Sequence, residues 1–589
     1  MSMLGERTGQ RGLFEADHLY LDHVGRHSFY GFLASMRGRL FQDEEFADLY
    51  CRDNGRNSVP PSLLATALLL QTHDKVSDDE AKQRADFDIR WKVALGISVD
   101  ERPFAKSTLQ LFRAHLILHD KARAVFQRSL QFARKTGYVK NRRMKAALDT
   151  SYILGRGAVK DTYNLLADGI ILVVRALAAL EGKKAEVWAR ERGLERYFGS
   201  SVKGEAGINW DNRKARQAFL QEIVADADRV LEMARQSQTG EPEGSIRRQG
   251  IIEAAGLLGQ LLLQDIERKD EGISLREGVS RDRIVSVHDP EMRHGHKSSR
   301  KRFDGHKAAV AVDTDSQLIT AVDVLAGNAS DNTGALELVE QSEDNTGVEV
   351  EESIGDCAYG DGATRQTFVE AERTLVAKMP GRPHKAHFPK EDFLIDLEAG
   401  TCTCPAGKVT RRVRTVPARN HSGQACCVQR FYFHGATCRT CHLRDACVAA
   451  GKGKGRTVTL HPQEALLQQA RSLQQSEAFG EYRRRRQISE HRIARLVQLG
   501  MRQARYFGRA KTLFQLLMAA TVANLTLVAT KIGGMGKMKR ATAPLLSFFI
   551  SWLVSTIIIP VPSLFAVTAL LPVCSTEMSC TKGGFRPDF

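Results

Sequence analysis

The first 25 residues of this 589-residue chain lack an apolar run of the kind that forms the core of a secretory signal. Charges of both signs are spread through this stretch, so we expect a cytoplasmic protein. Acidic residues are also in deficit: 69 Asp and Glu stand against 85 Lys and Arg, giving a formal net charge of +16 and a pI near 9.4. This balance favours a polyanionic partner such as nucleic acid, although a merely basic soluble protein stays open. The charge concentrates at Arg293 to Lys307, Lys408 to Arg430 and Arg483 to Lys511.

Charge is absent altogether from Ala541 to Thr576, a stretch that is long and apolar enough to suggest a membrane span. Pro560 and Pro562 interrupt it, so we interpret it as an extension foreign to the rest of the chain, with a membrane segment as the lesser alternative. Residues 512–530 are apolar too, but Gln515 and Asn524 indicate a core helix. Membrane association is therefore not expected.

Cysteine is rare outside one short segment, which holds seven of the eleven. In a reducing compartment such a cluster indicates metal binding before disulfides. Cys438-x2-Cys441 has the spacing of a zinc half-site, Cys447 follows, and Cys404 or Cys402 can supply the fourth thiolate of a structural zinc ribbon. His434 and His442 are reserve ligands, and buried free thiols are the alternative.

Helical patterns fill residues 29 to 136. Ser77-x-x-Glu80 predicts a capped helix that ends at Gly96, and Ser107-x-x-Gln110 predicts the start of another. Short capped helices in succession are typical of a helix-turn-helix-like DNA-binding module, and equally of an ordinary helical bundle. A second helical region from about 165 to 276 resembles an insertion between strand-rich segments.

Two predicted strands each carry one acid among apolar residues, Asp149 in AALDTSYI and Asp356 in SIGDCAYG. Burying a lone carboxylate is costly unless it is paired or binds metal. Carboxylates hold Mg²⁺ or Mn²⁺, and two such ions activate a nucleophile and stabilise the leaving oxygen in phosphodiester cleavage. The alternative for each is a strand-end Asp that caps a turn; Asp161 and Asp361 are interpreted as such caps, since each begins a helical pattern.

A third acid, Glu490, lies in the helical pattern YRRRRQISEHRIARLVQLG. Arg486, Glu490 and Val497 share one stripe at helical spacing, which predicts that Glu490 faces inward, toward a sheet. The alternative is a solvated Glu490 that pairs with Arg486 four residues earlier.

Four segments occur in a telling order: LDTSYILGRGAVKDTYNLL, RFDGHKAAVAVDTDSQLITAVDVLAGNASDN, IGDCAYGDGATR and ISEHRIARLVQLGMRQARYFGRAKTLFQLLMAATVANL. This order resembles bacterial insertion-sequence transposases of the DDE type, and the helical N-terminal part resembles the InsH-type domain that precedes their core. The resemblance covers roughly residues 28 to 532. It implies an α/β fold with a ribonuclease-H-like mixed-sheet catalytic core.

The resemblance implies catalytic, metal-binding roles for Asp149, Asp356 and Glu490. Arg486 matches the arginine of the family signature Tyr-x2-Arg-x3-Glu-x6-Lys, but Arg483 stands at its tyrosine position and Val497 at its lysine position. Basic residues beside the third acid and before the core hairpin would contact DNA phosphates. The DNA-binding set is Arg483, Arg486, Arg492, Arg495, Arg502, Arg505, Lys297, Arg300 and Lys301.

The implied enzyme binds the terminal inverted repeats of a mobile element, hydrolyses phosphodiesters and transfers 3′-OH ends to target DNA. Its cofactors would be two Mg²⁺ or Mn²⁺ ions, with a structural Zn²⁺. Its partners would be double-stranded DNA and further copies of itself, a homodimer or larger, on the nucleoid. Alternatives are a metal-dependent nuclease on the same core, or an inactive DNA-binding derivative. The expected regions are 1–140 (helical, DNA-binding), 141–164 (core), 165–276 (helical insertion), 277–395 (core), 396–460 (cysteine-rich), 461–532 (core helices) and 533–589 (tail).

Overall fold

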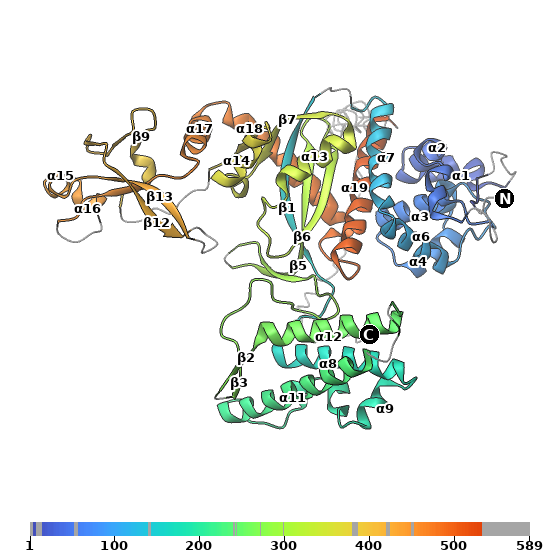
Figure 1. Cartoon of the computed structure of the whole chain (residues 1–589). Coiled ribbons are helices and arrows are strands. Elements are labelled where there is room, and N and C mark those ends of the chain that lie inside the picture. Colours follow the sequence, from blue (N-terminus) through green and yellow to red (C-terminus); the bar gives the residue numbers. More distant parts are fainter. Residues whose placement is uncertain are drawn as a thin grey trace, which may run out of the picture. The chain divides into compact units, whose positions relative to one another are not determined.

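The computed structural model places two units along the chain, Met1–Met535 and Gly536–Phe589. The structure describes residues 4–7, 14–51, 57–139, 143–238, 242, 244–270, 272–298, 300–379, 387–419, 425–448 and 453–532, all within the first unit (Figure 1). The apolar stretch 541–576 and the expected tail 533–589 lie outside the described residues.

Seven α-helices precede the first strand in the described residues. They are α1 (Ala16–Val24), α2 (Phe29–Leu40), α3 (Pro61–Asp74), α4 (Asp78–Phe87), α5 (Ile89–Leu95), α6 (Lys106–Leu118) and α7 (Lys121–Lys135). Ser77 caps α4 by accepting a hydrogen bond from the Glu80 amide, and Gly96 ends α5 in the left-handed conformation, as the sequence predicted.

Two local expectations in this region were wrong. The single helix expected between Ser77 and Gly96 is broken at Asp88, whose carboxylate accepts the Arg90 amide hydrogen bond and so starts α5. Helix α6 begins at Lys106 with no side-chain cap, so Ser107 is inside the helix. In both cases a competing local hydrogen bond or packing decides the boundary.

A six-stranded mixed sheet follows, made of β1 (Arg143–Leu154), β4 (Arg293–His296), β5 (Arg302–Asp313), β6 (Ile319–Ala326), β7 (Glu349–Gly355) and β8 (Leu375–Ala377). Strand β5 is antiparallel to β1 on one edge and to β6 and β4 on the other, whereas β1, β7 and β8 run parallel. The β5–β6 hairpin occurs where two apolar, strand-forming segments of the sequence flank a turn at Asp315 and Ser316. The chain is therefore a mixed α/β protein, as expected.

Helices cover both faces of this sheet. Met144, Ala146 and Leu148 of β1 pack with α13 (Ala335–Thr346) and α14 (Gly362–Glu370) in one apolar cluster. The opposite face, including Val310 and Val312, packs with α7 and with α19 (Arg509–Ile532). Because strand side chains alternate between faces, one continuous apolar run on β5 serves both cores.

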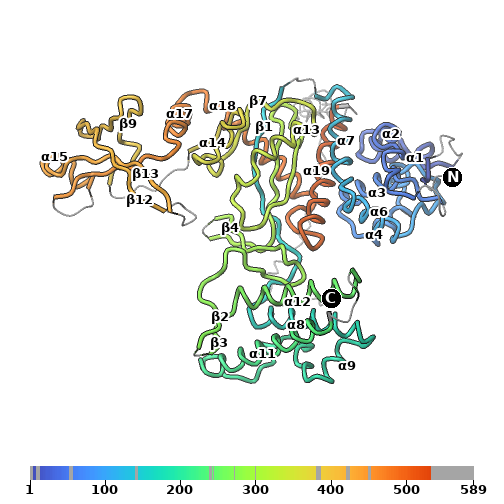
Figure 2. Tube along the Cα trace, in the orientation of Figure 1, coloured from blue at the N-terminus to red at the C-terminus, as the bar shows by residue number. Residues whose placement is uncertain are grey.

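Between β1 and β4 the chain leaves the sheet and makes a helical region with its own core, as the path in Figure 2 shows. Trp188 and Tyr197 are fully buried there. Its helices are α8 (Thr162–Leu180), α9 (Ala185–Arg190), α10 (Val202–Glu205), α11 (Arg213–Gln238) and α12 (Ile246–Asp265). The region was expected to be wholly helical, but α12 ends at Asp265 and a two-stranded pair follows, β2 (Ile266–Lys269) with β3 (Gly272–Leu275).

A small β-rich region separates β8 from the last core helices. It contains β9 (Leu394–Asp396), β10 (Thr401–Thr403), β11 (Val409–Thr410), β12 (Val413–Arg419), β13 (Ala425–Tyr432) and β14 (Thr457–Thr459), with short helices α15 (Gly435–Arg439) and α16 (Arg444–Cys447). Its core is small and includes Phe431, Cys402 and Cys447. Helices α17 (Glu464–Gln475) and α18 (Phe479–Leu496) follow, and a π-helical turn, Val497–Met501, precedes α19.

Two described helices are long and apolar enough to cross a membrane by length and composition, Thr162–Leu180 and Arg509–Lys531. In this structure 56% and 78% of their apolar windows are buried against other protein residues. Burial inside the protein accounts for their apolar character, and for the second helix it agrees with the core helix expected from the sequence.

Candidate active site

The first two acids lie side by side because of the parallel pairing of β1 with β7. The last paired residues are Ala147 and Ile354, and two residues further along each strand stand Asp149 and Asp356. Strand β7 ends at Gly355, where the Asp356 carboxylate accepts a hydrogen bond of 2.8 Å from the Ala358 amide. Strand β1 continues to Leu154, so Asp149 stands on a strand edge that β7 no longer covers.

The third acid comes from α18, which packs along β1. Ser489 donates a hydrogen bond of 3.1 Å to the Asp149 carboxylate, and the Arg486 guanidinium lies 3.9 Å from it. The same guanidinium is 2.5 Å from the Glu490 carboxylate. The Glu490 side chain is 53% exposed, so it forms the pair with Arg486 that the alternative interpretation described.

All three acids nevertheless line one open cleft of about 660 Å³. Its wall also contains Val497, from the π-helical turn, and Arg486. Because the cleft is open, an extended polymer backbone can pass through it, which an enclosed pocket would not allow. Three carboxylates on its wall form a hard-oxygen donor set, which is the chemistry that Mg²⁺ and Mn²⁺ prefer.

The pKa of the Asp149 carboxyl is raised to about 6, chiefly by burial and also by the nearby charge of Asp356. Hydrogen bonds from the Thr150 amide and Ser489, together with the charge of Arg486, act in the opposite direction. Burial also holds the pKa of the Tyr359 hydroxyl well above its ordinary range, to which the charges of Asp149, Asp331 and Asp356 add. A carboxyl whose pKa is shifted by burial beside a second acid in a cleft is typical of functional sites.

One side of the cleft is basic and centred on Tyr152 of β1. The Arg502 guanidinium lies 3.9 Å from the centroid of the Tyr152 ring, and the ammonium groups of Lys301 and Lys297 lie 5.2 and 5.5 Å from it. The hydrogen bond with Lys301 lowers the pKa of the Tyr152 hydroxyl. Three cations around one half-buried ring create a place for an anionic phosphate beside the acids.

The sequence analysis missed three further polar residues at this site. Lys307 is buried on β5, and its ammonium donates hydrogen bonds to the Ala329 carbonyl at 2.6 Å and to Asp331 at 2.7 Å. Both Lys307 and Asp331 line the cleft, and Ser489 bonds Asp149 directly. A lysine within the apolar run HKAAVAV was the available signal, because a buried ammonium requires a partner.

The other arginines expected to bind DNA differ in their surroundings. Arg483 is exposed and lines a second pocket beside Asp356, and Arg300 is exposed. Arg495 is half-buried and donates to Gln498 at 3.3 Å, whereas Arg505 lies 3.2 Å from Asp78 of α4.

Arg492 is a correction to the expected DNA-binding set. Its side chain is only 7% exposed, burial lowers its pKa to about 10, and two of its guanidinium nitrogens have no hydrogen-bond partner within the described residues. It lies one residue from the exposed His491 but on the opposite, packed side of α18. A side chain enclosed in this way does not reach a DNA strand in the cleft.

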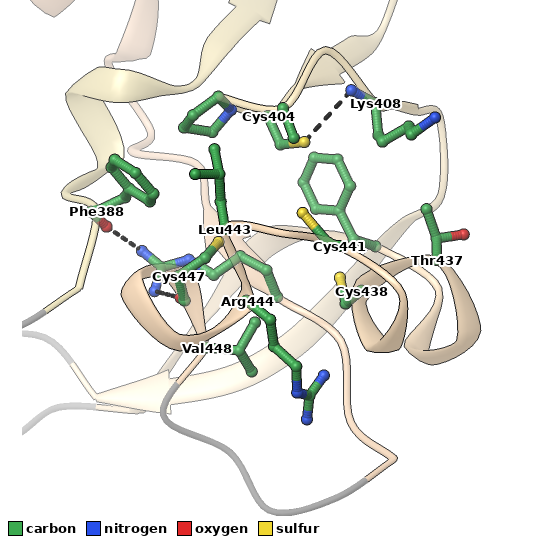
Figure 3. Close-up of a pocket in the computed structure, with 14 residues that line it drawn as sticks. Phe388, Cys404, Lys408, Thr437, Cys438, Cys441, Leu443, Arg444, Cys447 and Val448 are labelled. Atoms are coloured by element: carbon green, nitrogen blue, oxygen red, sulfur yellow. Dashed lines mark hydrogen bonds between the residues drawn. The ribbon is translucent and has the colours of Figure 1, made fainter.

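The cysteine-rich region brings four thiols to one pocket. Cys404, Cys438, Cys441 and Cys447 line it, and its inner space is about 20 Å³ (Figure 3). The Lys408 amide donates a hydrogen bond of 3.3 Å to the Cys404 sulfur. Among the described residues, no group of three or more His, Cys, Asp or Glu has the geometry of a bound metal ion.

The reserve ligands expected for zinc are placed elsewhere. Cys402 is fully buried in the core of the region, where burial raises the pKa of its thiol to about 11. His434 accepts a hydrogen bond from the Ala436 amide and so caps α15. Of Cys402 and Cys404, only Cys404 reaches the pocket. The predicted caps also occur: Asp161 caps α8 and Asp361 caps α14.

Two protein-family models match the chain. Residues 22–115, within the helical N-terminal region, match the transposase domain described as DUF772. Residues 403–529 match a transposase DDE domain, and this match includes Glu490 and the four pocket cysteines but not Asp149 or Asp356. No curated protein matches the chain.

Both matched domains are those of DNA-processing enzymes, which act on the polyanion that the basic composition predicted. Together they support the assignment of this chain to the insertion-sequence transposases of the DDE type, the family that the sequence motifs resemble.

Proposed function

We propose that the chain binds the terminal inverted repeats of an insertion sequence, hydrolyses phosphodiester bonds there and transfers the 3′-OH ends to target DNA. One observation carries this proposal: Asp149, Asp356 and Glu490, from three separate elements, line the same cleft. The strand order β6-β5-β1-β7-β8, with β5 alone antiparallel to its neighbours, supports a ribonuclease-H-like core.

The three carboxylates supply the hard oxygen donors that divalent metal prefers, although among the described residues they are not gathered as closely as the ligands of one bound ion. Asp149 is mostly buried, and its pKa is near 6. Among the described residues, Arg486 is the only cation paired with Glu490. A bound metal would therefore neutralise carboxylate charge that the protein's own cations neutralise only in part. Bound Mg²⁺ or Mn²⁺, two ions in this proposal, would activate the attacking oxygen and neutralise the leaving one. Asp149, Asp356 and Glu490 would hold these ions.

The chain's own cations would position the DNA. Lys297, Lys301 and Arg502 surround Tyr152 on the cleft wall and would hold a phosphate next to the scissile one. Arg483 beside Asp356, together with the exposed Arg300, would extend this track. The N-terminal helices would recognise the transposon ends, with copies of the chain assembling on DNA at the nucleoid.

Two alternatives keep specific support. The lysine of the family signature is replaced by Val497, which lines the cleft. Tyr482 stands one residue before the signature's tyrosine position, and its hydroxyl donates a hydrogen bond to Glu352 at 2.9 Å instead of contacting a strand in the cleft. These departures favour either a nuclease that cuts without joining or a DNA-binding protein that does neither.

End-labelled duplexes that carry the element's terminal sequence, incubated with Mg²⁺ and a target plasmid, separate the three functions. Joined products support the transposase, cleaved but unjoined ends support the nuclease, and a shifted but intact duplex supports the binding protein. Glu490→Gln should abolish cutting and joining while leaving the duplex bound, because affinity depends on Lys and Arg contacts to phosphate. Undiminished joining by Glu490→Gln would contradict the assigned third ligand.

A structural zinc in the cysteine pocket is a second proposal. Four thiols line a space of about 20 Å³, and an amide N–H already contacts the Cys404 sulfur, as outer-shell donors do around metal thiolates. Purified protein should contain about one zinc per chain, and Cys438→Ser with Cys441→Ser should remove it and lower the melting temperature. Cys426→Ser with Cys427→Ser is the matched control; equal melting of both pairs without zinc contradicts the proposal.

A further inference from the structure

Strands β12 and β13, together with residues 408–412 that lead into β12, form an antiparallel ribbon whose side chains are largely exposed, and β14 pairs with β13 at its base, from Arg430 to Tyr432. Seven residue pairs from Val413↔Phe431 to Arg419↔Ala425 define its register. Of the β12 residues, only Val416 and Ala418 are half-buried, and the rest are exposed. On β13 only Phe431, near the base of the ribbon, is buried in the apolar core of the region. One face of the ribbon is exposed and the other is only half-buried, so its surface is available for a partner.

This ribbon carries charge of one sign. Between Glu398 and Asp445 the sequence has no acidic residue and eight Lys or Arg. Lys408, Arg411, Arg412 and Arg414 are exposed, Arg430 is half-buried, and none of the five forms an ion pair with another described residue. Elsewhere in the described chain, many arginines do have a carboxylate partner, as Arg485 has Asp315. The absence of internal counter-charges leaves the ribbon with a local positive field.

The register adds to this field, because Arg414 and Arg430 are directly opposite one another. Like charges at opposed positions of an antiparallel pair destabilise it. Arg414 lies over the ring of Tyr432, 5.6 Å from its centroid, and Arg430 donates to the Thr459 hydroxyl at 3.1 Å. These contacts hold the two guanidinium groups on one face without neutralising either. An anion between them would relieve the repulsion.

We propose that the ribbon is a DNA-contacting arm that binds the phosphate backbone of a duplex through Arg411, Arg412, Arg414 and Arg430. The proposal rests on the proposed function, since it takes DNA as the substrate. Guanidinium groups make bidentate contacts with phosphate, and the aromatic Tyr432 between them provides a flat surface beside the strand. These contacts read no sequence, so the arm strengthens binding to any duplex.

The test is the salt dependence of duplex binding by the full chain. The variant Arg411→Gln, Arg412→Gln, Arg414→Gln removes three charges, and the removal of each arginine that neutralises a phosphate should lower the slope of log affinity against log salt by about 0.9. We expect a slope shallower by roughly 2 to 3, and an equal fractional loss of affinity for terminal-repeat and scrambled duplexes. The same three positions changed to Lys should retain most of the slope.

The control removes the same charge from exposed arginines of the helical region, Arg190→Gln, Arg213→Gln, Arg247→Gln. Both Gln variants should melt with the parent, since the changed side chains are exposed. The proposal is wrong if the slope of log affinity against log salt is unchanged in the ribbon variant, or if it changes equally in the control. If the ribbon variant loses binding to RNA of equal length but not to duplex DNA, the ribbon has another partner and the proposal is also wrong. If the parent itself binds no duplex, the proposed function fails first.

Discussion

Without bound metal, the buried Asp149 carboxylate lowers the free energy of unfolding at neutral pH. Replacing Asp149 by Asn tests this directly. The carboxyl pKa rises from its ordinary 3.8 to about 6, chiefly because the group is buried with only 16% of its side chain exposed. A carboxyl whose folded-state pKa exceeds its unfolded value favours folding in its protonated form. Its contribution is therefore fully present below pH 3.8 and is lost as the pH rises through about 6.

The magnitude follows from these two values. At pH 8 both states are ionised, and the displacement from 3.8 to about 6 corresponds to ~3 kcal/mol against folding. At pH 5 the folded group is mostly protonated and the cost is ~1.6 kcal/mol. Asn keeps the shape and the acceptor for the Thr150 amide but has no charge to desolvate. We expect Asp149→Asn to be more stable than the parent without metal by up to ~3 kcal/mol at pH 8, and by about half of that at pH 5.

Urea unfolding at pH 8 and pH 5, each with EDTA and with 10 to 20 mM Mg²⁺ (roughly the concentration that a weak site requires), measures these differences. Mg²⁺ should stabilise the parent and have little effect on the variant. Asp161→Asn is the control: Asn and Asp are equivalent caps for α8, so neither pH should separate it from the parent. If Asp149→Asn is no more stable than the parent at pH 8 in EDTA, or if its advantage does not shrink at pH 5, burial does not govern this carboxyl.

Because protons compete with metal for the Asp149 carboxyl, whose pKa is about 6 without metal, the Mg²⁺ concentration that gives half-maximal DNA cleavage should rise as the pH falls from 8 to 5; an unchanged concentration would contradict this. Lys307→Met should destabilise the protein by ~1 to 3 kcal/mol, because removing the buried ammonium leaves Asp331 and the Ala329 carbonyl without their donor. The exposed control, Lys301→Met, should be close to neutral in the same urea titration. Arg492→Met should be neutral or stabilising by ~1 kcal/mol, because an apolar side chain replaces a buried guanidinium with unsatisfied nitrogens. The dependence of DNA affinity on salt concentration should not change. A shallower dependence would return Arg492 to the DNA-binding set.

Features that depend on neighbours along the chain could be predicted from the sequence. Ser77, Asp161 and Asp361 cap helices because each accepts backbone hydrogen bonds two or three residues ahead. The β5–β6 hairpin follows from two apolar, strand-forming segments that flank a short turn. Asp149 and Asp356 could also be singled out as candidate site residues, since an isolated carboxylate in an apolar strand is informative wherever the strand is placed.

Only the tertiary structure decided which side chains share a site. The parallel register of β1 and β7 brings Asp149 beside Asp356, and no local pattern encodes a register between segments so far apart. The packing of α18 on β1 places Ser489 on Asp149 and leaves Glu490 half-exposed on the cleft wall.

The same reasoning explains the errors. A run of arginines indicates one charged surface, but a helix turns each residue by about 100°, so Arg492 is buried while Arg483 and Arg484 are exposed and Arg495 is half-buried. Cys402 and Cys404 were equivalent candidates in the sequence; Cys402 lies within β10 and is buried in the small core, whereas Cys404 follows the end of this strand and lines the pocket. The sequence determined the local elements and the kinds of chemical groups; long-range pairing and packing, which depend on the whole chain, determined where those groups meet.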